Sequence, residues 1–104
     1  TLSGLPSHRF VFEGFLPPKT VGRCKKLESL KNEEGTIIFY ESPHRLLKTL
    51  EDFKTVYNDP VMVVARELTK MFEEVKKGRA SELIGHFTAN PPKGEFVLLI
   101  NLED

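Results

Sequence analysis

Three short polar segments hold the side chains that could do chemistry, and each adjoins a run of apolar residues. In residues 41–45 (Glu-Ser-Pro-His-Arg) a carboxylate, a hydroxyl, an imidazole and a guanidinium lie together. Residues 66–70 (Arg-Glu-Leu-Thr-Lys) and residues 93–95 (Lys-Gly-Glu) are the other two. Ligands of α/β proteins bind where loops meet at the carboxyl ends of strands, so these segments are the candidate site. An ordinary helix cap and solvated or tight turns are the alternative interpretations.

Residues 17–31 form the one clearly basic stretch of the sequence. The basic residues in this stretch are Lys19, Arg23, Lys25, Lys26 and Lys31. Such a stretch is a candidate for contact with phosphate groups, although a solvated helix face has the same composition. It has no interleaved aromatic residues, which argues against the stacking of nucleic acid bases there.

Composition excludes several classes of protein. The 104 residues contain 15 Lys plus Arg and 15 Asp plus Glu, so the chain lacks the overall basicity of a protein that holds nucleic acid by charge alone. The single cysteine, Cys24, forms neither an intrachain disulfide nor a zinc site, and no other metal site is expected. No apolar run is long enough to span a bilayer, so we expect a soluble, cytoplasmic protein without membrane contact. The first residue is Thr1, and residues 1–7 are typical of the end of a longer protein, which predicts a fragment.

The elements that must position these residues follow from hydrophobic spacing. Strands are predicted at residues 9–15, 36–40, 61–65 and 96–100, with a weaker one at 73–77. Helices are predicted at about residues 21–30, 43–57 and 81–87. These elements predict one α/β domain.

Local patterns predict details of four elements. Ser42 is expected to cap the second helix, with Pro43 in its first turn. The apolar runs 36–40 and 61–65 are typical of strands covered on both faces, and the helix between them suggests a βαβ unit. In the first strand, alternation puts Phe12 and Gly14 on one side.

Taken together, the motifs resemble the C-terminal domain of the tetrapyrrole methylase family. The residues that carry the resemblance are 3–6 (Ser-Gly-Leu-Pro), 12–17 (Phe-Glu-Gly-Phe-Leu-Pro), 39–45 (Phe-Tyr-Glu-Ser-Pro-His-Arg), 65–70 (Ala-Arg-Glu-Leu-Thr-Lys) and 93–95 (Lys-Gly-Glu). The resemblance implies an α/β fold with a mixed five-stranded sheet and flanking helices. It also implies that residues 1–104 are one domain, the second half of a two-domain methyltransferase that uses S-adenosyl-L-methionine and forms a homodimer.

The motif Tyr-Glu-Ser-Pro-His-Arg favours the branch of this family that methylates small-subunit ribosomal RNA, at the ribose 2′-hydroxyl of a cytidine. The alternatives are a methyltransferase for a corrin or porphyrin precursor, and a non-catalytic module for RNA binding or dimerisation. In the family, glycine-rich loops of the N-terminal domain hold the methionine part of the cofactor. We therefore expect the isolated chain to be inactive.

The resemblance and the chemistry of methyl transfer assign roles to individual residues. By resemblance, the contacts to the adenosine of the cofactor are Tyr40, Glu41, Leu68, Thr69, Glu95 and Phe96. Transfer to a hydroxyl needs in-line placement and a proton acceptor, for which the candidates are Glu41, His44 and Glu67. The expected RNA contacts are Arg45, Arg66 and Lys70, together with Lys19, Arg23, Lys25 and Lys26 of the basic stretch.

Overall fold

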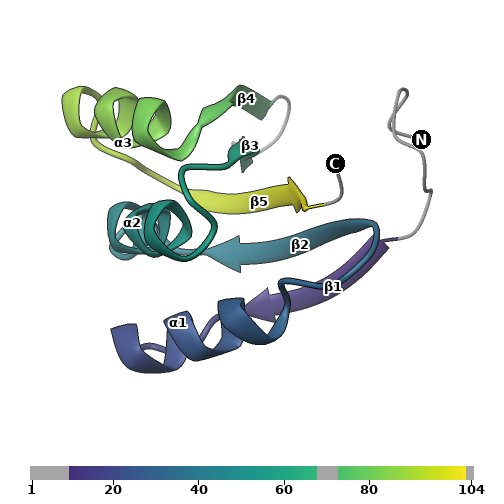
Figure 1. The fold of residues 1–104 in the computed structure, drawn as a ribbon. Helices are drawn as coiled ribbons and strands as arrows, with labels where there is room; N and C mark the ends of the chain where they lie inside the picture. The colour runs from purple at the N-terminus through teal and green to yellow at the C-terminus, as the bar shows by residue number, and fades with distance from the viewer. Residues whose placement is uncertain (1–9, 68–72, 103–104) are drawn as a thin grey trace.

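Five strands and three helices make up the computed structural model, which describes residues 10–67 and 73–102 (Figure 1). In chain order they are β1 (Phe10–Phe15), α1 (Thr20–Ser29), β2 (Thr36–Glu41), α2 (Leu46–Val56), β3 (Val61–Glu67), β4 (Glu73–Arg79), α3 (Ala80–Ala89) and β5 (Glu95–Asn101). The element types and their order agree with the sequence prediction. The predicted α/β class with a mixed five-stranded sheet is confirmed.

The strands form one sheet in the order β1-β2-β5-β3-β4. Neighbours β1 and β2 are parallel, and every other neighbouring pair is antiparallel. The βαβ unit predicted around α2 therefore has the expected strand directions, but β5 lies between its two strands. An adjacent parallel pair occurs instead around α1.

The helices cover one face of the sheet (Figure 1), where α2 contacts both α1 and α3. Every second residue of the central strand β5 points into the core, and Phe96, Leu98 and Ile100 are at most 1% exposed. The rings of Phe39 and Phe53 join β2 to α2 with centroids 5.4 Å apart. Burial of this one apolar layer supplies most of the driving force for the fold.

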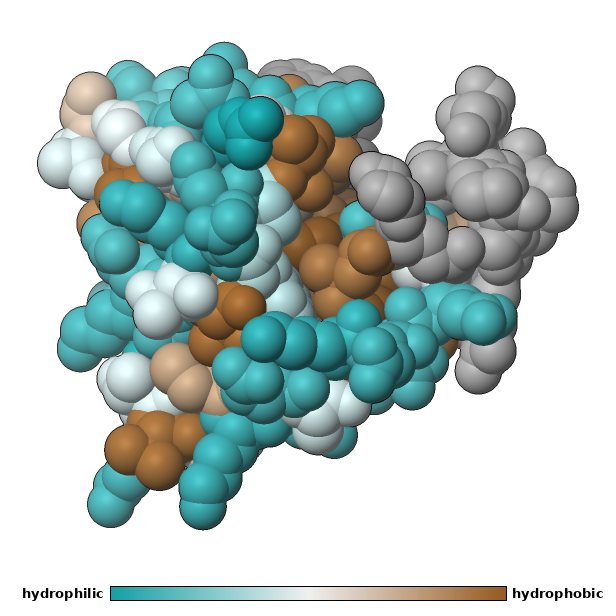
Figure 2. All heavy atoms as spheres, in the orientation of Figure 1, coloured by the Kyte–Doolittle hydropathy of each residue, from teal (hydrophilic) through white to brown (hydrophobic). Residues whose placement is uncertain are grey.

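The opposite face of the sheet is open among the described residues. Tyr40 is 41% exposed and Val61 is 49% exposed. The expectation that residues 36–40 and 61–65 are covered on both faces is therefore wrong. Figure 2 shows hydrophobic side chains (brown) at the surface among hydrophilic ones (teal), to the right of the helices of Figure 1.

A bulge in β1 gives the open face an aromatic cluster. The register with β2 shifts between Phe12 and Gly14. Phe12 therefore pairs with Ile38, and Phe15 pairs with Tyr40. Gly14 thus changes sides relative to strict alternation, with a φ of 73° that favours glycine. The ring centroids of Phe12 and Phe15 lie 5.1 and 5.6 Å from that of Tyr40.

The start of α2 also differs from the prediction. Arg45 occupies the N-cap position without a side-chain cap hydrogen bond, and Ser42 and Pro43 lie before the helix. The backbone N–H of Arg45 donates to the carbonyl of Ser42 at 3.1 Å, which closes a turn. The expectation that Ser42 caps this helix is wrong, because this turn delays the helix to Leu46.

No helix in residues 10–67 and 73–102 is long and apolar enough to cross a membrane.

Candidate functional site

The three polar segments chosen from the sequence meet at one edge of the sheet. Glu41, at the end of β2, pairs with Phe96 of β5, and Arg66 of β3 pairs with the same residue from the other side. Glu67 pairs with Glu95 one position further on. Residues 93–95 reach this edge because β5 is antiparallel to β2 and β3. In an all-parallel sheet, a segment that precedes a strand would lie at the opposite edge.

Glu41 is a buried anchor within the first segment, with 2% exposure. Its Oε2 atom accepts a hydrogen bond from the Thr49 hydroxyl at 2.6 Å, and its Oε1 atom accepts one from the Ser42 N–H at 2.9 Å. The Nε of Arg45 lies 3.8 Å from Oε1. The interpretation of Glu41 and Arg45 as an ion pair in solvent does not fit this burial. His44 is exposed and the Arg45 side chain is 35% exposed, so these two face solvent.

The second segment is described only in part. Arg66 forms an ion pair with Glu74 of β4, with 2.6 Å between Nη2 and Oε1, and its side chain is 23% exposed. The backbone of Glu67 lies in β3, but its side chain is outside the described part of the structure. The predicted site residues Leu68, Thr69 and Lys70 also lie outside the described residues.

The third segment presents backbone and one carboxylate at this edge. Glu95 is exposed, and Gly94 has a φ of 85°, which explains why glycine precedes the strand. Phe96 is 0% exposed and its ring packs on that of Phe87, with centroids 5.5 Å apart. Only the backbone of Phe96 can therefore contact a ligand. Tyr40 presents its ring on the open face of the sheet.

Arg23 differs from the other basic residues of segment 17–31, because it is 2% exposed. Its Nε donates to Oδ2 of Asp52 at 2.5 Å, and its two terminal nitrogens donate to the Pro18 carbonyl and the Thr20 hydroxyl. The guanidinium thus fixes α1 to α2 and has no place on a basic surface, contrary to the expectation from charge patterning. The exposed residues of this stretch include Lys19, Lys25, Lys26 and Lys31.

Two further side chains of α1, those of Lys26 and Cys24, contact carboxylates of other elements. Lys26 forms an ion pair with Glu13 of β1 at 3.1 Å. Cys24 lies with its sulfur 3.7 Å from Oδ1 of Asp52. Burial and the Asp52 carboxylate raise the pKa of the Cys24 thiol, which favours its protonated form. Among residues 10–67 and 73–102, no group of His, Cys, Asp and Glu side chains is arranged to hold a metal ion.

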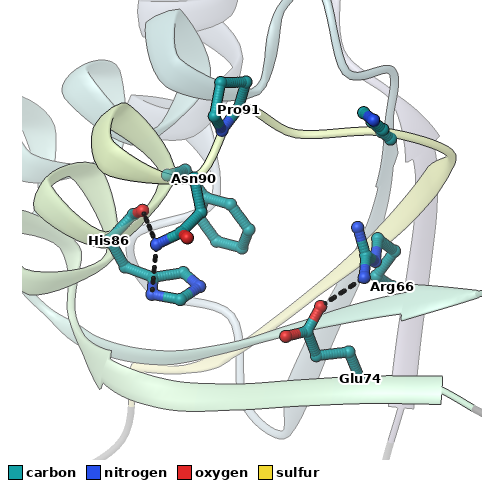
Figure 3. A pocket seen from close by; sticks show the side chains of 7 residues that line it. Arg66, Glu74, His86, Asn90 and Pro91 are labelled. Carbon is teal, nitrogen blue, oxygen red and sulfur yellow. Dashed lines mark hydrogen bonds and ion pairs between the residues drawn. The ribbon is translucent and has the colours of Figure 1, made fainter.

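A cavity of about 360 Å³ adjoins the second and third segments on the side of the helices (Figure 3). Its walls come from β3, β4, the end of α3 and the loop before β5. The lining residues are Arg66, Glu74, His86, Phe87, Asn90, Pro91 and Lys93. The site residues predicted from the sequence did not include Glu74, His86 or Asn90. No linear pattern joins these residues, so only their distance in space could reveal them.

The fold resembles that of a domain in a solved methyltransferase structure. The solved structure of the cobalamin biosynthetic enzyme cobalt precorrin-4 methyltransferase aligns with 100% of this chain and 45% of its own chain, with a TM-score of 0.64 and 19% identity. That enzyme is a tetrapyrrole methylase, so the predicted fold class and this likeness agree. No protein-family model matches the chain.

Sequence similarity is much higher to another methyltransferase. The chain is 49% identical over 100 residues to the ribosomal RNA small subunit methyltransferase I of Erythrobacter litoralis, covering 96% of this chain and 36% of that protein. The proteins of the same name from Synechocystis sp. and Thermotoga maritima are 52% and 43% identical, over 94% and 96% of this chain and 36% and 45% of their own length. The chain is therefore a homologue of part of these ribosomal RNA small subunit methyltransferase I proteins. It spans less than half their length.

Proposed function

We propose that this chain is the C-terminal domain of an S-adenosyl-L-methionine-dependent methyltransferase that modifies the ribose 2′-hydroxyl of a cytidine in small-subunit ribosomal RNA. The observation that carries the proposal is the identity of 43–52% to proteins named for that RNA, over nearly the whole chain. A tetrapyrrole substrate is less well supported, because identity to the cobalt precorrin-4 enzyme is 19%. The proposal includes an N-terminal domain supplied by the remaining length, a homodimer and a cytoplasmic location.

The edge where the three segments meet suits an adenosine. Tyr40, Phe12 and Phe15 offer exposed aromatic surface at this end of β2, and an adenine ring stacks on such surfaces. Glu95 offers an exposed carboxylate that accepts hydrogen bonds from hydroxyl or amino groups. Glu41 and Phe96 are buried and would contribute through their backbone, and Leu68 and Thr69 remain predicted contacts. When bound, the cofactor supplies a methyl group activated by the positive sulfur.

The geometry favours His44 over Glu41 as the proton acceptor. Its imidazole is exposed on the turn before α2, at the edge where the substrate would lie. Both carboxylate oxygens of Glu41 already accept hydrogen bonds, so Glu41 acts as a positioning residue that fixes this turn. Glu67, at the end of β3, stays a predicted acceptor.

Exposed cations near the same edge would contact the RNA backbone. Arg45 follows His44, and Lys19 follows β1, which is parallel to β2 and so ends at the same edge. Lys25 and Lys26 lie further along α1, which carries them away from the edge by about 1.5 Å per residue. They would contact a more distant part of the RNA. Lys70 remains a predicted contact.

The test uses a chimera in which this chain replaces the matching segment of the Synechocystis relative. The chimera and the isolated chain are incubated with labelled S-adenosyl-L-methionine and small ribosomal subunits. We expect label at a cytidine 2′-O position with the chimera and no label with the isolated chain. Cofactor binding by the chimera without label in RNA would contradict the proposal and favour a small-molecule substrate.

Changes of single residues in the chimera test their roles. Arg45→Ala is expected to reduce turnover on RNA about tenfold or more with little change in cofactor binding. His44→Ala should reduce kcat without weakening RNA binding. The matched control is Lys48→Ala, at an exposed position on α2. Equal loss of cofactor binding and turnover in the Arg45 variant would make that residue structural.

A further inference from the structure

We propose that the cavity between α3 and the β3–β4 pair binds one phosphate group of an RNA chain. The proposal rests on the proposed function in one respect, because the RNA substrate would supply this phosphate. It assigns a role to Arg66 and Lys93 as ligands, and to Glu74 as an ion-pair partner that competes with the phosphate for Arg66.

Arg66 carries the strongest sign of a missing ligand. Its Nε is buried and has no hydrogen-bond partner among the described residues. The neighbouring Nη2 is held by Glu74 at 2.6 Å, so the guanidinium is fixed in place. A buried donor without an acceptor is unfavourable, and an anionic oxygen would supply that acceptor. Guanidinium groups match phosphate oxygens well because they donate from a planar fork.

The charges of the lining suit a phosphodiester. Arg66 and Lys93 are positive and Glu74 is negative, which leaves one net positive charge in the cavity wall. A phosphodiester carries one negative charge. Figure 3 shows Arg66 across the cavity from His86 and Asn90, whose amide donates to the His86 carbonyl at 3.0 Å. Phe87 and Pro91 add apolar walls beside this polar group, where a ribose or base could pack.

The position of the cavity connects it to the proposed catalytic edge. Arg66 pairs with Phe96, and Phe96 pairs with Glu41, so the three lie in one row across β3, β5 and β2. Neighbouring strands are about 4.8 Å apart, which puts Arg66 about 10 Å from the end of β2. One RNA strand can therefore reach both places.

The test measures binding of a short single-stranded oligoribonucleotide to this chain by fluorescence anisotropy, between about 50 and 200 mM salt. Lys93→Gln is expected to weaken binding at the low salt about threefold to tenfold, and to reduce the slope of log K against log salt by about 0.7. Glu74→Gln is expected to tighten binding, because it frees Nη2 and raises the net positive charge. The control Lys48→Gln makes the same charge change at an exposed position on α2.

Three outcomes would overturn the proposal. Equal losses in Lys93→Gln and Lys48→Gln would mean that binding depends only on overall charge. Weaker binding in Glu74→Gln would contradict competition between Glu74 and the phosphate for Arg66. Binding of inorganic phosphate, measured by calorimetry, to a chain that does not bind the oligoribonucleotide would replace RNA by a free phosphate as the ligand. Unfolding curves of each variant separate lost binding from lost folding.

Failure of the proposed function would look different. If the chimera transfers no methyl group to RNA while the oligoribonucleotide still binds with the expected variant effects, the phosphate site stands and the enzymatic proposal falls. If methyl transfer succeeds and Lys93→Gln has no effect on RNA binding, the enzymatic proposal stands and the phosphate site falls.

Discussion

Arg23 and Glu41 show that charge in a sequence does not reveal exposure. Both lie in segments that look like polar surface, yet each is 2% exposed. Arg23 meets Asp52 from α2, and Glu41 meets Thr49 from the same helix. A buried charge is tolerated only with such partners. Since these partners are distant in sequence, charge patterning alone assigns the wrong environment to both residues.

At the residue scale, we predict that Asp52→Ala lowers the free energy of unfolding by about 3–5 kcal/mol, because it leaves the Arg23 guanidinium buried without its carboxylate. The control is Lys31→Gln, which removes the exposed ion pair of Lys31 with Glu28 and should cost at most about 0.5 kcal/mol. Urea unfolding of the three proteins measures both. A loss below about 1 kcal/mol in Asp52→Ala would show that the pair contributes little.

At the element scale, α3 is anchored by the turn that ends α2. Asp59 accepts hydrogen bonds from the Ser81 N–H at 2.7 Å and the Ser81 hydroxyl at 2.8 Å. These bonds satisfy an N–H of the first turn of α3, which helix geometry leaves without a partner. They hold the pKa of the Asp59 carboxyl below its usual value of 3.8.

This lowered pKa predicts a pH dependence of stability. The charged form of Asp59 stabilises the fold above pH 3.8, and that contribution is lost as the pH falls through the lower folded pKa. Asp59→Asn should therefore be less stable than the unchanged chain at pH 7, with a smaller difference at about pH 3. Asparagine also tolerates the φ of 54° at this position. Urea unfolding at both pH values measures the difference.

Glu51→Gln, at an exposed position on α2, is the matched control for the Asp59 variant. It removes a carboxylate of the same charge and should show no comparable pH-dependent difference. A constant difference between Asp59→Asn and the unchanged chain at both pH values would mean that the Asp59 charge has no part in anchoring α3.

Element types were predictable because each depends on local hydrophobic spacing. The runs 61–65 and 96–100 became β3 and β5, and the periodicity of residues 81–87 became α3. The start of α2 was not predictable, since the Glu41 carboxylate holds Ser42 in a turn. The bulge in β1 escaped prediction because its reason is pairing with β2.

At the scale of the whole molecule, the helices cover one face of the sheet and leave an aromatic cluster on the other. Phe12 is 60% exposed, whereas Phe39 is fully buried. We predict that Phe12→Ser changes the free energy of unfolding by about 0.5 kcal/mol or less, while Phe39→Ala costs about 3–5 kcal/mol. Thermal and urea unfolding measure both variants. Similar losses for the two would show that the open face is covered in solution.

The sequence by itself determined the classes of the elements and the α/β fold class, and it singled out three polar segments as the candidate site, because spacing, turn residues and motif order are local properties. Tertiary structure decided which segments meet and which charges are buried. Strand β5 enters antiparallel between β2 and β3, and this brings residues 93–95 beside residues 41–45 and 66–70. The cavity of Arg66, His86 and Lys93 exists for the same reason. Contacts between residues far apart in the chain depend on how all the elements bury their apolar faces together, and no local pattern encodes that arrangement.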